Sequence, residues 1–95
     1  MTTQTASVQA RQMLGRLGFK KLGKASQTPG SLWAMGRDRY YAECWKESWG
    51  CSIHVNGPGF TTSYIGYATA YDITEPADIE ATETAIGGKL QELHA

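Results

Sequence analysis

The stretch RYYAECWKESWGCSIHVN, residues 39–56, carries the pattern from which we predict the fold. Two runs rich in aromatic and β-branched residues, Arg39–Lys46 and Trp49–Asn56, flank the short polar segment Glu47-Ser48. Such runs are typical of two strands joined by a tight turn. Apolar and polar residues alternate in both, which indicates a sheet with one buried and one exposed face.

A two-residue turn at Glu47-Ser48 predicts which residues of this hairpin lie opposite each other. Side chains alternate between the two faces of a strand, so each row of pairs belongs to one face. The apolar row, which we expect to face the core, contains the pairs Cys44–Cys51, Ala42–Ile53 and Tyr40–Val55. The polar row, which we expect to face outward, contains the pairs Glu43–Ser52, Tyr41–His54 and Arg39–Asn56. Trp45 shares the outward parity.

Further elements surround this hairpin. A helix over Ser7–Leu17 follows from an apolar stripe, with Thr5 or Ser7 as its cap and Gly18-Phe19 as its glycine stop. The stripe contains Ala6, Ala10, Met13, Leu14 and Leu17. A second helix over Glu75–His94 follows Thr74 as a predicted N-cap. Additional strands are predicted over Phe19–Lys24, Leu32–Gly36 and Phe60–Tyr71.

This order, α-β-β-β-β-β-α, predicts an α+β fold in one domain, residues 1–95. We expect a two-layer sandwich in which an antiparallel meander of four to five strands is flanked by the N-terminal and C-terminal helices. A turn at Arg37-Asp38 would place Trp33 and Met35 on the core side.

Two local features lead to further expectations. The register of Phe60–Tyr71 is open, and we favour Ile65, Tyr67 and Tyr71 inside with Phe60 and Tyr64 outside. Glycine is unfavourable inside a helix. We therefore expect Gly87-Gly88 either to break the second helix or to let it lie close to the sheet, and Gly15 to allow a close crossing.

Composition excludes several classes of protein. With 41% hydrophobic and 19% charged residues, the chain is too apolar and too weakly charged for an intrinsically disordered protein. No apolar run approaches the ~18–20 residues of a membrane span. Two cysteines are too few for a disulfide framework, and the amino terminus lacks the apolar stretch of a signal peptide. We expect a cytoplasmic protein with reduced, buried thiols and no membrane partner.

Charge is distributed unevenly although the net charge is zero. Residues 1–46 hold eight cations and two anions, a balance of +6, and residues 47–95 hold one cation and seven anions, a balance of −6. An uneven distribution of charge is informative about binding partners and not about the fold. Neighbouring elements could neutralise each other within the fold, or the two signs could form separate binding surfaces.

His54 is the sole candidate for acid–base catalysis, since His94 is next to last in the chain. Its parity places it on the opposite face of the sheet from Cys44 and Cys51, which argues against a Cys–His nucleophilic pair and against a zinc site. We predict no catalytic residues, no cofactor and no metal.

The outward row is the predicted partner-binding surface, because aromatic residues interleaved with cations suit recognition of proteins or bases. Its residues are Arg39, Tyr41, Trp45, His54 and Tyr64. An ordinary solvated face or a homodimer face are the other interpretations. The alternative function is direct nucleic-acid binding, through Arg11, Arg16, Lys20, Lys21, Lys24 and Arg37 together with Arg39. A third is a small enzyme centred on His54.

In its order of helix, meander and helix, the chain resembles double-stranded RNA-binding domains. That family places a lysine cluster at the start of its second helix, where this sequence has Glu75-Pro76-Ala77-Asp78-Ile79-Glu80, so no RNA-contacting residue is carried over. The small size and charged faces resemble small α+β proteins of phages and mobile elements, including anti-CRISPR proteins. That resemblance implies a stoichiometric inhibitor, and the leading prediction is a non-enzymatic module that binds a protein or nucleoprotein partner.

Overall fold

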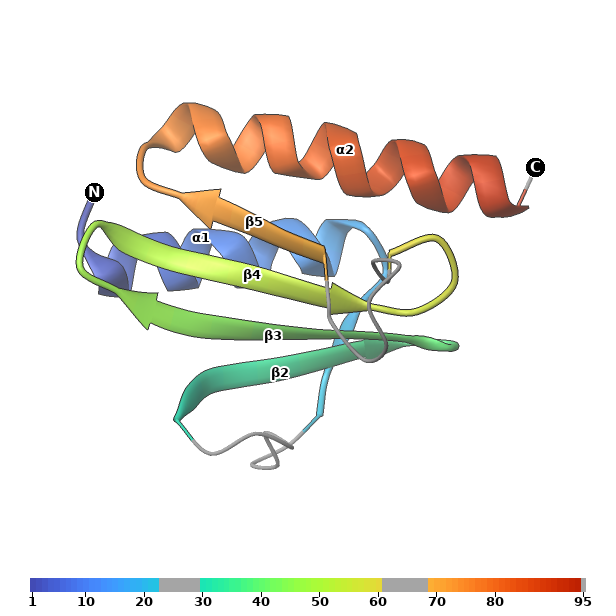
Figure 1. The fold of residues 1–95 in the computed structure, drawn as a ribbon, viewed down its shortest axis with the longest axis horizontal. Coiled ribbons are helices and arrows are strands. Elements are labelled where there is room, and N and C mark those ends of the chain that lie inside the picture. Colours follow the sequence, from blue (N-terminus) through green and yellow to red (C-terminus); the bar gives the residue numbers. More distant parts are fainter. Residues whose placement is uncertain (23–29, 61–68, 95) are drawn as a thin grey trace.

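The computed structural model describes residues 1–22, 30–60 and 69–94 and shows the predicted order of elements (Figure 1). Two helices enclose five strands in sequence, which form one antiparallel sheet in the order β1-β2-β3-β4-β5. The elements are α1 (Thr3–Arg16), β1 (Lys20–Lys21), β2 (Ser31–Arg37), β3 (Tyr40–Glu47), β4 (Gly50–Asn56), β5 (Thr69–Ile73) and α2 (Pro76–His94). The predicted α+β sandwich with a meander is confirmed.

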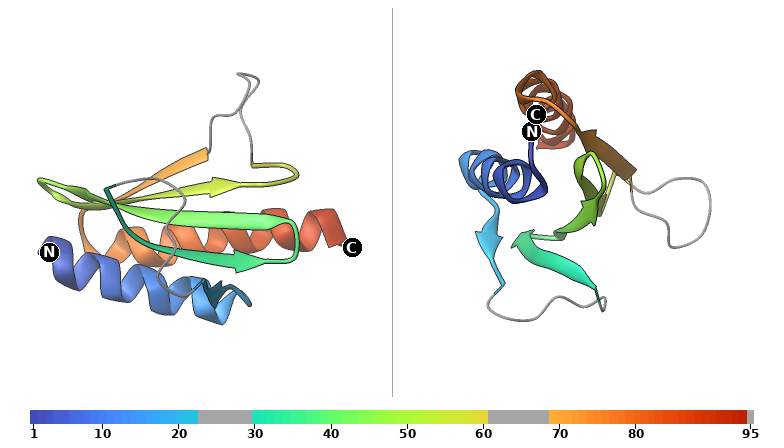
Figure 2. Two further views of the ribbon diagram at one scale, coloured as in Figure 1. Left: turned by 90° about the horizontal axis from the view of Figure 1, so that it is seen from below. Right: turned by 90° about the vertical axis from the view of Figure 1, so that its left-hand side faces the viewer.

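Both helices lie on the same side of the sheet, which leaves its other face without a helix (Figure 2). Helix α1 packs on β3 and β4 in the middle of the sheet, whereas α2 packs on β5 and on α1. The sheet curves around α1, so the core lies between α1, α2 and the concave face.

Helix α1 begins four residues earlier than the apolar stripe predicts. Thr2 is its N-cap, and the Thr2 side chain accepts a hydrogen bond from the backbone N–H of Thr5 at 3.2 Å. The predicted glycine stop is confirmed: Gly18 has a φ of 91°, and the N–H of Phe19 donates to the carbonyl of Leu14 at 3.0 Å. This pattern closes the last turn and directs the chain into β1.

The predicted register of both central hairpins is wrong by two residues, yet the assignment of faces is right. The turn between β3 and β4 is Ser48-Trp49, so Cys44 lies opposite Ile53 and Glu43 opposite His54. The turn between β2 and β3 is likewise Asp38-Arg39 and not Arg37-Asp38. Moving a two-residue turn by one position shifts every pair by two, and a shift of two keeps each side chain on its face.

Gly50 gives a physical reason for the observed β3–β4 turn. Its φ is 153°, and a Cβ atom at this position would collide with the carbonyl oxygen of Ile73. The first residue of β4 must therefore be the glycine, because only a residue without a side chain lets β4 pass this close to β5.

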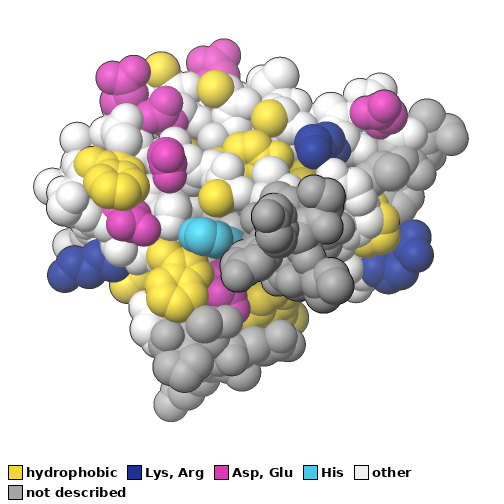
Figure 3. Space-filling view, in the orientation of Figure 1, with side chains coloured by type: hydrophobic (Ala, Val, Ile, Leu, Met, Phe, Trp, Pro, Cys, Tyr) yellow, Lys and Arg dark blue, Asp and Glu magenta, His cyan; other side chains and the backbone are white. Residues whose placement is uncertain are grey.

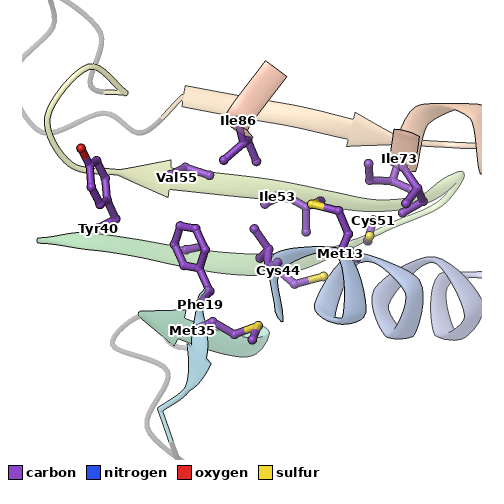
Figure 4. Close-up of a cluster of buried hydrophobic side chains, with 14 of the residues drawn as sticks. Met13, Phe19, Met35, Tyr40, Cys44, Cys51, Ile53, Val55, Ile73 and Ile86 are labelled. Carbon is purple, nitrogen blue, oxygen red and sulfur yellow. The ribbon is translucent and has the colours of Figure 1, made fainter. Parts of the chain in front are cut away.

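The core contains the residues that alternation and the helix stripe predict (Figure 4). Ile53, Val55 and Ile86 are fully buried, while Trp33 and Leu17 are partly buried against the cluster. Phe60 contradicts the expectation that it faces outward. It lies in the turn after β4 and not in a strand, it is fully buried, and it packs edge-on against Tyr40 with ring centroids 5.6 Å apart.

The described part of this region contains strand β5 (Thr69–Ile73), which continues two residues beyond the predicted end at Tyr71. Tyr71 pairs with Ile53 and packs against the core, as expected. Ile65, Tyr67 and Tyr64 lie outside the described residues.

Helix α2 begins at Pro76. The prediction that Thr74 is its N-cap is wrong, because Thr74 lies two residues before the helix. The Thr74 hydroxyl donates to Asp78 Oδ2 at 2.7 Å, and the N–H groups of Thr74 and Glu75 donate to the same oxygen. These bonds hold the pKa of Asp78 below its ordinary value. The helix continues through Gly87-Gly88, and Gly87 lies close to Leu17 of α1 and not to the sheet. A Cβ atom at Gly15 would meet nothing within 4 Å, so no close crossing occurs there.

Candidate functional site

The helix-free face of β3 and β4 carries a group of polar and aromatic side chains that we call the outer-face cluster. Its members alternate along the two central strands: Tyr41, Glu43 and Trp45 on β3, and Ser52 and His54 on β4. Cross-strand pairing places Glu43 opposite His54 and Trp45 opposite Ser52. Figure 3 shows this face, where hydrophobic, acidic and histidine side chains lie side by side.

Glu43 is the centre of the cluster on β3. Its two carboxylate oxygens accept hydrogen bonds from both neighbours on the same face, from the Tyr41 hydroxyl at 2.7 Å and from Trp45 Nε1 at 3.0 Å. Glu43 is only 7% exposed, which is unusual for a carboxylate on a face without a helix. Buried charges require partners of this kind, so the carboxylate fixes the orientation of both rings.

A second chain of hydrogen bonds runs along β4. The Ser52 hydroxyl donates to Glu47 Oε1 at 3.2 Å and lies 3.0 Å from His54 Nε2. The Ser52 hydroxyl therefore lies within hydrogen-bond distance of both Glu47 and His54, and it has a single proton to donate. These contacts connect His54, Ser52 and Glu47 along β4.

The position of Ser52 bears on the third predicted function, an enzyme centred on His54. A histidine that activates a serine must accept the hydroxyl proton at its free nitrogen. Here the Ser52 hydroxyl is only 3% exposed, so a substrate has little access to it, and its single proton is shared between two neighbours, Glu47 and His54. The arrangement suits orientation of the imidazole better than nucleophilic catalysis.

Trp45 and His54 join the two chains. Their rings meet edge to face, with centroids 6.1 Å apart and an interplanar angle of 63°. Trp45 is half-buried, so part of its ring faces solvent while its N–H is bound to Glu43. The cluster thus presents an aromatic surface whose side chains are already ordered.

Three of the predicted partner-binding residues, Tyr41, Trp45 and His54, are brought together in this cluster. Arg39 lies apart from them: it is exposed in the β2–β3 turn, and Tyr41 takes the predicted place of Arg39 opposite Asn56. Tyr64 lies outside the described residues. The sequence interpretation missed Glu43 as the organising residue, although a carboxylate with Tyr and Trp two positions away on either side could have indicated it.

Two of the residues predicted to form a basic surface, Arg16 and Arg37, make contacts within the fold. Arg16 forms an ion pair with Glu83 at 2.7 Å, which raises the pKa of Arg16 and lowers that of Glu83. Arg37 Nη1 donates to the carbonyl of Leu17 at 2.6 Å, where a cation satisfies the C-terminal end of α1. Lys20 and Lys21 are exposed, and Arg11 is partly exposed. Lys24 lies outside the described residues.

Both cysteines are free and fully buried on the core face. Their hydrogen bond and their burial raise the pKa of the Cys44 thiol above its ordinary value. They face away from His54, as parity predicts. In the described ranges, no three His, Cys, Asp or Glu side chains are placed to hold one metal ion.

Neither described helix is both long and apolar enough to cross a membrane. Comparison of the sequence with protein-family models, with curated proteins and with solved structures finds no significant match.

Proposed function

We propose that this protein is a non-enzymatic binding module that engages a protein or nucleoprotein partner through the outer-face cluster. The observation that carries the proposal is the fixed indole of Trp45, which is held by Glu43 and by the edge of His54 while remaining partly exposed. Tryptophan, tyrosine and arginine dominate the energetics of protein interfaces when a partner desolvates them.

Pre-organisation strengthens this argument. Binding orders side chains, and each immobilised side chain costs about 0.5–1.5 kcal/mol. In the outer-face cluster that ordering has occurred in the free protein, because Tyr41 and Trp45 are both bound to Glu43. A rigid aromatic surface of this kind favours recognition of a partner with little further loss of entropy.

Because the cluster supports recognition and not turnover, we propose stoichiometric action, as in the small inhibitors of phages and mobile elements. We place this action in the cytoplasm, where the two free thiols would stay reduced. Arg39 at the neighbouring turn would extend the surface at its edge.

Direct nucleic-acid binding is a second candidate, which the adjacent exposed side chains of Lys20 and Lys21 favour. Arg16 and Arg37 support it less, because each is engaged within the fold.

The experiment is a pull-down from the native host with nuclease-treated and untreated lysate in parallel, followed by a salt titration of the recovered complex. We expect recovery to survive nuclease treatment and affinity to change little with salt. Loss of recovery after nuclease, with affinity falling steeply as salt rises, would support the nucleic-acid alternative. Recovery of the protein alone, as a dimer closed over the cluster, would reject a foreign partner.

A further inference from the structure

A groove of about 590 Å³ runs along α2 where this helix meets the end of α1. Its lining residues belong to α2 and the C-cap of α1, whereas the outer-face cluster is carried by β3 and β4. Leu17, the C-cap residue of α1, lines one side of the groove, and its residues on α2 are Glu80, Glu83, Thr84, Gly87, Gly88 and Gln91. The α2 positions follow the spacing i, i+3, i+4, i+7, i+8 and i+11, which defines one continuous face of a helix.

Helix α2 therefore has two distinct long faces. One face, with Ile79, Thr82, Ile86 and Leu90, is buried against the core. The groove face has small and polar residues over the same length, roughly 17 Å at about 1.5 Å per residue. A helix that only needed to be solvated on this face would have no use for two adjacent glycines at its centre, because glycine is among the least favourable residues in a helix interior.

Packing within the protein accounts for only one of these glycines. A Cβ atom at Gly87 would lie 3.3 Å from Leu17 Cδ2, so the contact with α1 explains its small size. A Cβ atom at Gly88 would meet nothing within 4 Å. The fold does not require glycine at position 88, and the exposed Gly88 is one of the residues that line the groove.

The charge of the groove indicates what complements it. Glu83 is neutralised by Arg16. Glu80 is exposed on the same wall and forms no ion pair with any residue in the described part of the chain. Thr84 and Gln91 add uncharged polar groups. The groove thus combines one uncompensated negative charge with the apolar side chain of Leu17 and two glycines.

We propose that this groove binds an α-helix of a partner protein, with a lysine or arginine directed at Glu80 and small or apolar residues on Leu17 and Gly88. Helices pack at interaxial distances of about 8–10 Å, and glycine on the facing surface allows the shorter ones. An amphipathic helix in a groove between two helices is a recurrent mode of peptide recognition. This contact is separate from the outer-face cluster and goes beyond the proposed function.

The test is selection from a displayed library of helical peptides against the wild-type protein. We expect the enriched peptides to be amphipathic and to carry lysine or arginine. Individual peptides are then titrated against Gly88→Leu, and against Gly15→Leu as the matched control. Both glycines lie inside helices with free space for a side chain, but Gly15 lies outside the groove. We expect at least a tenfold loss of affinity, or about 1.4 kcal/mol, for Gly88→Leu, and a change within about twofold for Gly15→Leu.

Two further variants distinguish the effect of charge from that of shape, and binding in the groove from binding at the outer-face cluster. Glu80→Lys should weaken the cationic peptides, and Trp45→Ala should leave their binding unchanged while it weakens the partner of the outer-face cluster. The proposal is overturned if no peptide is enriched, if the enriched peptides are acidic, or if Gly88→Leu binds them as well as the wild type. A wild-type dimer that Gly88→Leu converts to a monomer would also overturn it, because the occupant would then be a second copy.

Discussion

The two faces of the β3–β4 hairpin both contain buried side chains, but for different reasons. On the concave face, Cys44, Ile53 and Val55 are buried by the helices through apolar contact. On the outer face, Glu43 and Ser52 are nearly as buried, at 7% and 3% exposure, and each is held by hydrogen bonds. A solvated sheet face would show exposed polar side chains, so the outer face is built as a structured surface.

The two faces therefore contribute differently to the stability of the protein and to recognition of a partner. Apolar burial is non-directional and scales with area, so the concave face supplies most of the stability. Hydrogen bonds contribute less to stability but fix orientation. The outer face uses them to hold two aromatic rings in place, which is the property a binding surface needs.

The largest expected contrast between the faces is in chemical accessibility. Cys44 and Cys51 should react with a thiol reagent about 10³-fold more slowly in the native protein than in the unfolded chain, because exposing them requires unfolding. The raised pKa of Cys44 adds to the protection of that thiol, since the thiolate is the reactive form, whereas the hydrogen bond with Cys44 lowers the pKa of Cys51, whose protection rests on burial. Labelling followed by mass spectrometry measures both rates. Rapid native labelling of both thiols would contradict the burial of the concave face.

A core truncation should have the largest effect on stability. Ile53→Ala should lower the free energy of unfolding by about 3 kcal/mol, because Ile53 is fully buried between β3, β5 and the helical layer. Chemical denaturation measures the change, and Val8→Ala, at an exposed position of α1, is the matched control. A loss below about 0.5 kcal/mol, the usual range for surface changes, would mean that the two faces are inverted.

On the outer face, Glu43→Ala should cost about 2 kcal/mol, because the Tyr41 hydroxyl and the Trp45 N–H lose a charged acceptor. Glu43→Gln should cost less, since its amide oxygen can still accept one of the two hydrogen bonds. Equilibrium denaturation of both variants gives the comparison. If Glu43→Ala is as stable as the wild type, the outer face is an ordinary solvated face.

The face assignment could be predicted from sequence because it depends only on alternation. Cys44 and Ile53 are on the concave face whether the turn is Glu47-Ser48 or Ser48-Trp49, and both turns are compatible with the composition. The exact pairing could not be predicted, because it is determined by a tertiary contact, the approach of Gly50 to the carbonyl of Ile73. Phe60 was misplaced for a similar reason: its burial comes from Tyr40, which is distant in sequence.

The candidate site was predictable in its aromatic members and not in its hydrogen bonds. Parity places Tyr41, Trp45 and His54 on one face, but spacing alone cannot show that Glu43 binds two of them or that Ser52 donates to Glu47. The hydrogen bond from Trp45 Nε1 to Glu43 also has a consequence for stability. Trp45 has a structural role, so Trp45→Ala should reduce stability by about 1 kcal/mol in addition to its effect on binding.

The most direct test of the central claim compares Trp45→Ala with Trp49→Ala. Both positions belong to the β3–β4 hairpin, but Trp49 is 44% exposed at the turn, whereas Trp45 lies within the outer-face cluster. Affinity for the partner recovered by pull-down should be measured at a temperature where thermal melts show both variants folded. We expect Trp45→Ala to weaken binding by at least about 1–2 kcal/mol and Trp49→Ala to change it by less than about 0.5 kcal/mol. Equal affinity of Trp45→Ala and the wild type would show that the ordered outer face is not the binding surface.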